Sequence, residues 1–184
     1  QESRGLGDVY KRRSSFIFPL ITFPYVSRIL LPEGTGKVSF ATSLISYFSM
    51  FAQLGIPTYG IRACAKVRDD KEELTRTTQE LVIINFVMSV ISYTALAVAL
   101  MLVPRLREER ALYIIVSLTI AFNVIGMEWM YKALEQYTYI TIRSIIFKFV
   151  ALIVMFVFVH QKSDYIFYGA ITILAASGSN IFNF

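Results

Sequence analysis

The sequence predicts an all-α protein, a polytopic bundle of about six transmembrane helices. Of its 184 residues, 55% are hydrophobic and only 17% are charged, whereas soluble domains usually have about a quarter of their residues charged. The apolar residues fall into blocks of about 20, the length at which a helix rising about 1.5 Å per residue crosses about 30 Å of hydrocarbon. Short connections separate the blocks. Together these observations indicate an integral membrane protein.

The apolar blocks predict six spans in chain order. Their ranges are 16–31, 38–61, 81–103, 112–129, 140–159 and 165–184. The first span is short, and we expect Pro19 and Pro24 to break its helix. Because the connections are brief, we expect successive spans to be antiparallel neighbours in one bundle. A polar amino-terminal segment, 1–15, precedes this membrane-embedded six-helix lobe, 16–184.

Basic residues are distributed unequally between the two sides of this topology. Twelve of the 18 Lys and Arg residues lie on the side of the amino terminus, and six lie on the other side. The positive-inside rule therefore predicts a cytoplasmic amino terminus, with outward turns at 32–37, 104–111 and 160–164. The net charge of +5 suits contact with anionic lipids. It does not indicate nucleic-acid binding, because the basic residues lie in short loops.

The longest loop, 62–80, is predicted on the inner side. Asp70 followed by Glu73 resembles a helix-start capping box, and Val67, Leu74 and Leu81 recur at seven-residue spacing. This pattern predicts a short helix along the membrane interface that leads into the third span. A solvated charged loop is the alternative.

Uncharged polar residues follow the helical period inside three spans. Five of them share one face of the second span: Ser39, Ser43, Ser46, Ser49 and Gln53. This stripe either packs against a neighbouring helix or lines a wet cavity. Residues of the third and fourth spans that can hydrogen-bond between helices are Asn85, Ser89, Ser92, Ser117 and Asn123.

Five charged residues lie in or near the spans. Glu128 and Lys132 are four residues apart, the spacing of a helical ion pair. Lys148 lies about 12 Å along the fifth span, a depth at which a lysine faces the bundle interior or water. Arg143 is shallower, and we expect it to reach the inner interface. Arg28 either extends to the outer headgroups or faces inward.

Catalytic and metal-binding patterns are missing from the sequence. The single cysteine, Cys64, excludes an internal disulfide, and the single histidine, His160, leaves no histidine cluster. The sequence contains no glycine-rich phosphate loop and no Ser-His-Asp set. We therefore expect a protein that is not an enzyme and that uses no cofactor.

Four stretches of the chain carry a recognisable pattern. They are FPLITFPYVSRIL at 18–30 with PEGTG at 32–36, LGIPTYGIR at 54–62 with AKVRDD at 65–70, the run from Glu128-Trp129 to Arg143, and Asp164-Tyr165. Together they resemble the polysaccharide or O-antigen flippases, often called Wzx. That family belongs to the multidrug/oligosaccharidyl-lipid/polysaccharide exporter superfamily. The resemblance covers residues 16–184.

The resemblance implies two six-helix lobes around a central cavity that opens alternately to each side of the bacterial inner membrane. This chain would be most of the first lobe. The implied substrate is an undecaprenyl-diphosphate-linked oligosaccharide for O-antigen, capsule or exopolysaccharide synthesis, moved from the inner to the outer leaflet. Expected partners are this lipid-linked oligosaccharide, membrane lipids and the polysaccharide polymerase machinery, but not nucleic acid.

Basic residues in such cavities are expected to meet the diphosphate, because isolated charges lose their solvation in a low-dielectric core. By position, the candidates are Arg28 and Lys148, with Arg143 and Lys132 near the inner entrance. Expected cavity-lining residues are Ser43, Ser46, Gln53, Asn85, Asn123 and Glu128.

The chain departs from the family pattern in two places. Residues 1–15 are polar and unlike the usual start, so the first helix is interpreted as shortened, replaced or tagged, and a second lobe is absent. Two other functions stay open. A cation-coupled multidrug exporter of the same superfamily would need a deep carboxylate, for which Glu128 is the candidate. A non-transporting scaffold of polysaccharide assembly would lack a second lobe in its full-length form.

Overall fold

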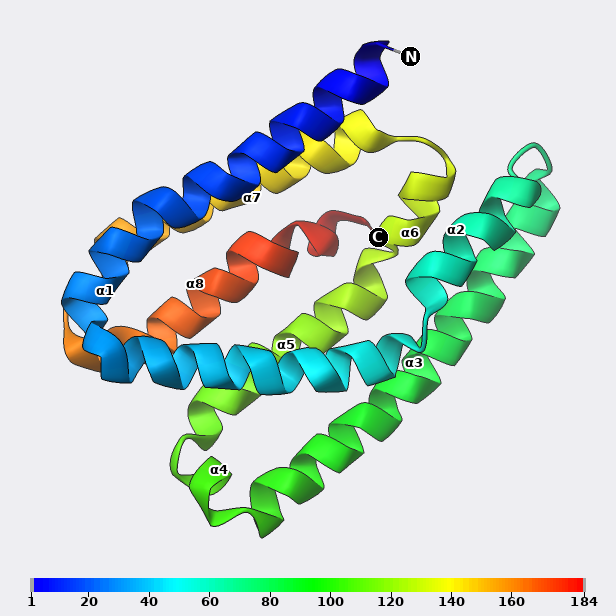
Figure 1. Ribbon diagram of the computed structural model, residues 1–184. Helices are drawn as coiled ribbons and strands as arrows, with labels where there is room; N and C mark the ends of the chain where they lie inside the picture. The colour runs from blue at the N-terminus through cyan, green and yellow to red at the C-terminus, as the bar shows by residue number, and fades with distance from the viewer. Residues whose placement is uncertain (1, 184) are drawn as a thin grey trace.

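The protein is built from helices throughout the part that the structure describes. The computed structural model describes the backbone of residues 2–183 and the side chains of residues 20–181. No strand occurs in this range (Figure 1). The helices are α1 (Glu2–Gln53), α2 (Ile56–Lys66), α3 (Lys71–Leu102), α4 (Pro104–Glu108), α5 (Arg110–Gly126), α6 (Glu128–Ala133), α7 (Tyr137–Phe158) and α8 (Tyr165–Ser177), with 3-10 helices η1 (Lys162–Asp164) and η2 (Gly178–Asn183). The predicted all-α helical bundle is confirmed.

The first two predicted spans lie within one element, α1, which bends sharply at Leu31. The predicted break at Pro19 and Pro24 is wrong, because the backbone of α1 is helical through both residues. Leu31 has φ 56° and ψ 175° and is not helical. The ring of the following Pro32 disfavours the helical region for the residue before it. The helix resumes at once, so the predicted outward turn at 32–37 belongs to the second arm of α1. The backbone of residues 2–15 is helical and continuous with α1, and the side chains of the predicted polar segment lie outside the described residues.

The two arms of α1 pack against different helices (Figure 1). The first arm buries Val26 and Leu30 against α7 and α8. The second arm buries Val38, Ala41 and Ile45 against α3, α5 and α8, and their three- and four-residue spacing gives one apolar face. The bend at Leu31 therefore lets a single element take part in both apolar cores.

A two-residue break separates α1 from α2. Leu54 and Gly55 both have left-handed backbone angles, with φ 47° and 74°, which end the preceding helix. Pro57 lies in the first turn of α2, where its missing N–H would have had no helical partner. The predicted second span is therefore interrupted near its inner end.

α3 is one uninterrupted helix that begins after Asp70. The Asp70 carboxylate accepts hydrogen bonds from the backbone N–H groups of Glu72 at 2.9 Å and Glu73 at 3.2 Å. The predicted N-cap at Asp70 is confirmed. The reciprocal hydrogen bond of a capping box is not formed, because the Asp70 backbone N–H donates to the carbonyl oxygen of Val67 at 3.1 Å. The prediction of a separate interfacial helix is wrong, because α3 continues without a break into the third span. Of the predicted loop 62–80, only residues 67–70 lie outside the helices.

α8 lies between α5 and α7 and packs against both (Figure 1). The expectation that successive spans are neighbours is therefore wrong for the fourth and fifth spans. The sequence of α8 contains no charged residue, and a helix that is apolar on all sides is typically buried between others. The short α6 carries the chain from α5 across to α7.

The three predicted outward turns meet at one end of the bundle. Lys37 Nζ lies 2.9 Å from Glu109 Oε1, and the Tyr165 hydroxyl donates to Glu109 Oε2 at 2.6 Å. These contacts join the second arm of α1, the α4–α5 connection and the start of α8. We call this the outer end. α2, α6 and the start of α7 lie at the opposite, inner end (Figure 1, upper right).

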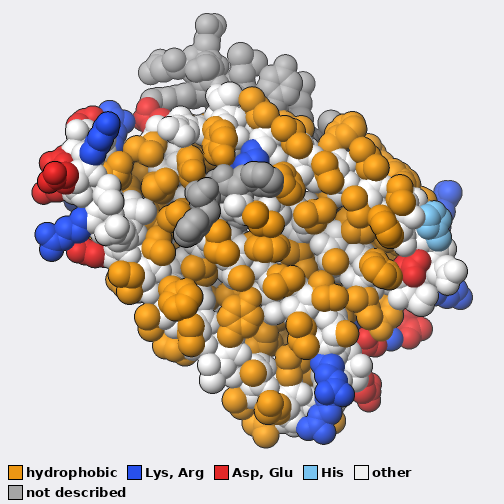
Figure 2. Space-filling model, turned by 180° about the vertical axis from the view of Figure 1, so that it is seen from behind, with side chains coloured by type: hydrophobic (Ala, Val, Ile, Leu, Met, Phe, Trp, Pro, Cys, Tyr) orange, Lys and Arg blue, Asp and Glu red, His pale blue; other side chains and the backbone are white. Residues whose placement is uncertain are grey.

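Apolar side chains cover the face of the molecule between charged rims (Figure 2). Large apolar residues such as Phe40, Phe86 and Phe149 are more than half exposed. Among the described residues, α3 and α7 are long and apolar enough to cross a membrane, and α5 is apolar but shorter. So large an exposed apolar surface indicates lipid contact, and the chain is a membrane protein.

Candidate functional site

Three adjoining hollows gather at the inner end, around α6 and the start of α7. A neutral pocket of about 180 Å³ is lined by Gln53, Pro57, Ile61, Asn85, Asn123, Glu128, Trp129, Lys132 and Asn180. A cationic pocket of about 250 Å³ is lined by Glu128, Ile140, Arg143, Ser144, Lys148, Ala175, Ala176, Ser179 and Asn180. An apolar groove of about 390 Å³ is lined by Tyr139, Ile142, Arg143, Ile146 and Phe147. The first two share Glu128 and Asn180, and the last two share Arg143.

Two glycines allow large side chains to enter this region. A Cβ on Gly60 would lie 2.6 Å from Cε3 of Trp129, so the backbone of α2 lies directly on the indole ring. A Cβ on Gly126 would overlap the side chain of Asn180. Met127, with φ 37°, then turns the chain from α5 into α6. These close approaches place Trp129 and Asn180 in the wall of the neutral pocket.

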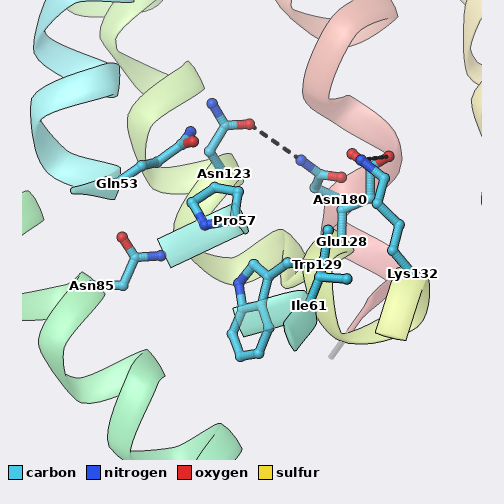
Figure 3. A pocket seen from close by; sticks show the side chains of 9 residues that line it. All are labelled: Gln53, Pro57, Ile61, Asn85, Asn123, Glu128, Trp129, Lys132 and Asn180. Atoms are coloured by element: carbon cyan, nitrogen blue, oxygen red, sulfur yellow. Dashed lines mark hydrogen bonds and ion pairs between the residues drawn. The ribbon is translucent and has the colours of Figure 1, made fainter. Parts of the chain in front are cut away.

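Hydrogen-bonding side chains from several helices surround the neutral pocket (Figure 3). Asn123 Nδ2 donates to Ser49 Oγ at 3.1 Å, and Asn180 Nδ2 donates to Asn123 Oδ1 at 3.4 Å. Asn85 Oδ1 and Trp129 Nε1 are buried and have no hydrogen-bond partner in the described part of the chain. Some polar atoms of the pocket are therefore hydrogen-bonded within the protein, and others are left to pair with a ligand.

Arg143 is the most unusual residue of the cationic pocket. Its side chain is only 7% exposed, and its Nε and Nη1 have no acceptor among the described residues. The guanidinium carbon lies 5.2 Å from the centroid of the Tyr139 ring, a favourable cation–π distance. Two buried guanidinium nitrogens without acceptors are costly, so the pocket is chemically suited to an anion. Lys148 adds a second basic group to the same pocket.

The carboxylate of Glu128 borders both pockets and is already paired. Its Oε1 lies 3.2 Å from Lys132 Nζ, which confirms the predicted four-residue ion pair. A cation-coupled exporter would need this carboxylate to hold its coupling ion. The pair with Lys132 weakens that alternative.

The structure brings together most of the predicted site residues. Those that line the two polar pockets are Gln53, Asn85, Asn123, Glu128, Lys132, Arg143 and Lys148. The prediction that Arg143 anchors at the inner interface is wrong. α7 begins at Tyr137, before the predicted start of the fifth span, so Arg143 lies deeper in the helix and is covered.

Three predicted site residues lie apart from these pockets. Arg28, Ser43 and Ser46 are exposed on the two arms of α1, and Ser46 donates a hydrogen bond to its own helix, at the carbonyl oxygen of Thr42. Within the serine stripe, Ser49 is buried and pairs with Asn123. Only the inner end of the predicted stripe therefore reaches the site.

Trp129, Ser179 and Asn180 are among the contributors that sequence reasoning missed. Trp129 is the last residue of the predicted fourth span, 112–129, where an interfacial anchor is the ordinary interpretation. Ser179 and Asn180 lie inside the predicted sixth span, 165–184, and their polarity there was an available signal. Their placement depends on η2 packing against α5, where the absence of a side chain on Gly126 leaves room for Asn180.

Comparison with known protein families identifies the chain. The family model described as polysaccharide biosynthesis protein matches residues 13–183. The chain belongs to this polysaccharide biosynthesis family. The resemblance stated from the sequence motifs is therefore confirmed.

Two relatives carry the name "Putative O-antigen transporter". The protein from Escherichia coli (strain K12) is 28% identical over 151 residues, which cover 82% of this chain and 36% of that protein. The protein from Shigella dysenteriae is 25% identical over 153 residues, which cover 82% of this chain and 38% of that protein. The chain thus spans little more than a third of the relatives' length. Both are named as transporters and not as enzymes, and no solved structure matches.

Proposed function

We propose that the full-length protein transports an undecaprenyl-diphosphate-linked oligosaccharide from the inner to the outer leaflet of the bacterial inner membrane by alternating access. The observation that carries the proposal is Arg143, a buried guanidinium with two nitrogens that have no acceptor in the described structure. The names of the two relatives support polysaccharide transport. The cationic pocket supports a substrate that carries negative charge.

The diphosphate is the part of such a substrate that is most costly to move into the membrane. Its charges lose their hydration when they leave water, and fixed cations and hydrogen-bond donors offset that loss. Arg143 and Lys148 supply the cations, and Ser144, Ser179 and Asn180 supply neutral donors around the same 250 Å³ pocket. Guanidinium groups suit phosphate because they present several donors in a plane.

The apolar groove next to Arg143 suits the polyprenyl tail. Its lining is almost wholly apolar, and Ile142 and Ile146 are more than half exposed on α7. Because Arg143 borders both hollows, one amphipathic molecule can place phosphates in the cationic pocket and its tail in the groove. This arrangement supports a lipid-linked substrate over a soluble anion.

Complementation tests this function directly. In a strain that lacks its O-antigen transporter, the full-length protein is expected to restore surface O-antigen. Arg143→Gln and Lys148→Gln are each expected to reduce it at least about tenfold, since loss of a charge-assisted hydrogen bond costs about 1.5–3 kcal/mol. Arg28→Gln and Lys132→Gln test the other two predicted cavity cations in the same assay.

The matched control is Lys162→Gln, which removes an exposed lysine of the outer turn and is expected to leave O-antigen unchanged. Immunoblots of the membrane fraction verify equal amounts of each variant. Wild-type O-antigen levels in both the Arg143→Gln and Lys148→Gln strains would remove the cationic pocket from the mechanism.

A further inference from the structure

The neutral pocket is lined chiefly by uncharged hydrogen-bonding groups. Four carboxamides reach it from α1, α3, α5 and η2: Gln53, Asn85, Asn123 and Asn180 (Figure 3). At one edge, Glu128 and Lys132 offset each other's charge at 3.2 Å. The pocket therefore offers hydrogen-bond donors and acceptors with little net charge.

Two buried side chains of this pocket have hydrogen-bonding capacity that the described part of the protein does not use. Asn85 is 2% exposed, and its Oδ1 accepts no hydrogen bond. Trp129 is 4% exposed, and its Nε1 donates none. Buried polar atoms are nearly always paired, because leaving them unpaired is destabilising. One available acceptor and one available donor suit a ligand that both donates and accepts.

A sugar ring fits this chemistry better than an ion or an apolar group. Hydroxyl groups donate and accept, and carboxamides pair with them in both directions. A cation would lie near Lys132, an anion would lie near Glu128, and an apolar group would leave the buried atoms unpaired. About 180 Å³ is the space of roughly six water molecules at about 30 Å³ each, which suits one ring.

We propose that the neutral pocket binds the sugar ring joined directly to the diphosphate of the transported lipid. This inference rests on the proposed function. The cationic and neutral pockets share Glu128 and Asn180, so a ligand with its phosphates near Arg143 places the attached ring beside Asn180. The substrate then lies across three adjoining hollows, with its tail in the groove, its diphosphate in the cationic pocket and its first sugar among the carboxamides.

Two lipid probes test the assignment with purified full-length protein in nanodiscs. One is bare polyprenyl diphosphate, and the other is the lipid-linked oligosaccharide extracted from the strain that carries the protein. The wild-type protein is expected to bind the sugar-bearing lipid about tenfold more tightly, because a site built to hydrogen-bond hydroxyls discriminates against a ligand that lacks them. Asn85→Leu and Trp129→Phe are each expected to abolish this preference while leaving the affinity for bare lipid unchanged.

Controls separate the sugar site from the anion site. Gln79→Leu, on the exposed surface of α3, is expected to keep the tenfold preference. Arg143→Gln is expected to weaken the binding of both lipids equally. Asn85→Leu keeps nearly the same side-chain size, so it decides the question even where Trp129→Phe lowers the thermal stability.

Two results would overturn the inference in different ways. If Asn85→Leu retains the preference for the sugar-bearing lipid and Arg143→Gln still weakens both, the neutral pocket is not a sugar site and the proposed transport function stands. If the wild-type protein binds neither lipid, the proposed function fails and the sugar site fails with it.

Discussion

Three residues of this protein have buried polar atoms without hydrogen-bond partners in the described structure. Arg143 is buried with two nitrogens that lack acceptors in the described structure, and Asn85 and Trp129 each have one buried polar atom in the same condition. Most buried polar groups in folded proteins are paired. All three residues line adjoining pockets at the inner end. Their unpaired atoms therefore mark the site more sharply than charge alone does.

The first prediction concerns Arg143. Replacing it by methionine, which is also long and unbranched, removes the buried charge, so Arg143→Met is expected to raise the free energy of unfolding by about 1 kcal/mol while abolishing O-antigen transport. Thermal unfolding of the purified protein and complementation measure the two effects. Arg62→Met, at an exposed position of α2, serves as the control and should change neither. A less stable Arg143→Met protein would show that the buried guanidinium nitrogens have hydrogen-bond acceptors in the folded state.

At the scale of elements, local backbone geometry decides where helices end and turn. Pro32 forces the bend in α1, Gly55 and the preceding residue separate α1 from α2, and Met127 turns α5 into α6. Each break has a left-handed or otherwise positive φ, which costs L-residues other than glycine about 1–3 kcal/mol. The breaks at Gly55 and Met127 allow α2 and α6 to pack against each other at the inner end.

The bend in α1 yields the second prediction. Leu31 combines positive φ with extended ψ, a region that glycine occupies freely, and its side chain is 38% exposed. Leu31→Gly is therefore expected to raise the free energy of unfolding by about 1 kcal/mol, as measured by thermal unfolding in detergent. Leu20→Gly, an exposed leucine within the helical part of the first arm, is expected to lower it by a similar amount. If both variants destabilise the protein equally, Leu31 does not have the positive φ described here.

The contact between α2 and α6 yields the third prediction. Gly60→Ala places a methyl group 2.6 Å from the rigid Trp129 ring, so it is expected to cost about 1–3 kcal/mol and to shift the tryptophan fluorescence, since Trp129 is the single tryptophan. Gly36→Ala is the matched control, because nothing lies within 4 Å of its added Cβ. In a helix that substitution should stabilise by up to about 1 kcal/mol. Unchanged fluorescence in Gly60→Ala would show that the two helices do not meet as described.

At the scale of the whole molecule, one charged cluster holds the outer end together. Glu109 accepts from Tyr165 and pairs with Lys37, and Lys37 also lies 3.5 Å from Glu33. The cluster connects α1, the α4–α5 connection and α8. Burial of Glu109 by itself would raise its pKa, but the hydrogen bonds from Lys37 and Tyr165 outweigh burial and lower the pKa.

The fourth prediction follows from the sign of that shift. Because the pKa of Glu109 is lower in the folded protein, its contribution to stability is present above the unfolded pKa of about 4.3 and is lost as the pH falls through the lowered value. Glu109→Gln is expected to lower stability by about 1 kcal/mol at pH 7 and to match the wild type at strongly acidic pH. Thermal unfolding across pH measures both. Glu108→Gln, which changes an exposed neighbour, should show the same dependence of stability on pH as the wild type. If Glu109→Gln remains less stable than the wild type at strongly acidic pH, the ionic contribution of Glu109 is refuted.

Much of the fold could be predicted because it depends on local properties. Apolar blocks of span length predict helices, Asp70 predicts a helix start that the structure confirms, and the four-residue spacing of Glu128 and Lys132 predicts their ion pair. The site was predictable only in part. Lys148 and Asn85 were recognisable as polar residues deep in apolar spans, whereas Asn180 enters the pocket only because η2 packs along α5.

By itself, the amino-acid sequence determined that this protein is a helical membrane protein of the polysaccharide biosynthesis family, since hydrophobic run length and short motifs act within single segments. Tertiary structure alone decided that α8 lies between α5 and α7, that Arg143 is buried and that Trp129 and Asn180 join one pocket. Arg143 illustrates the physical reason. Charge and depth along a helix are properties of one segment, but burial depends on which other helices cover that face.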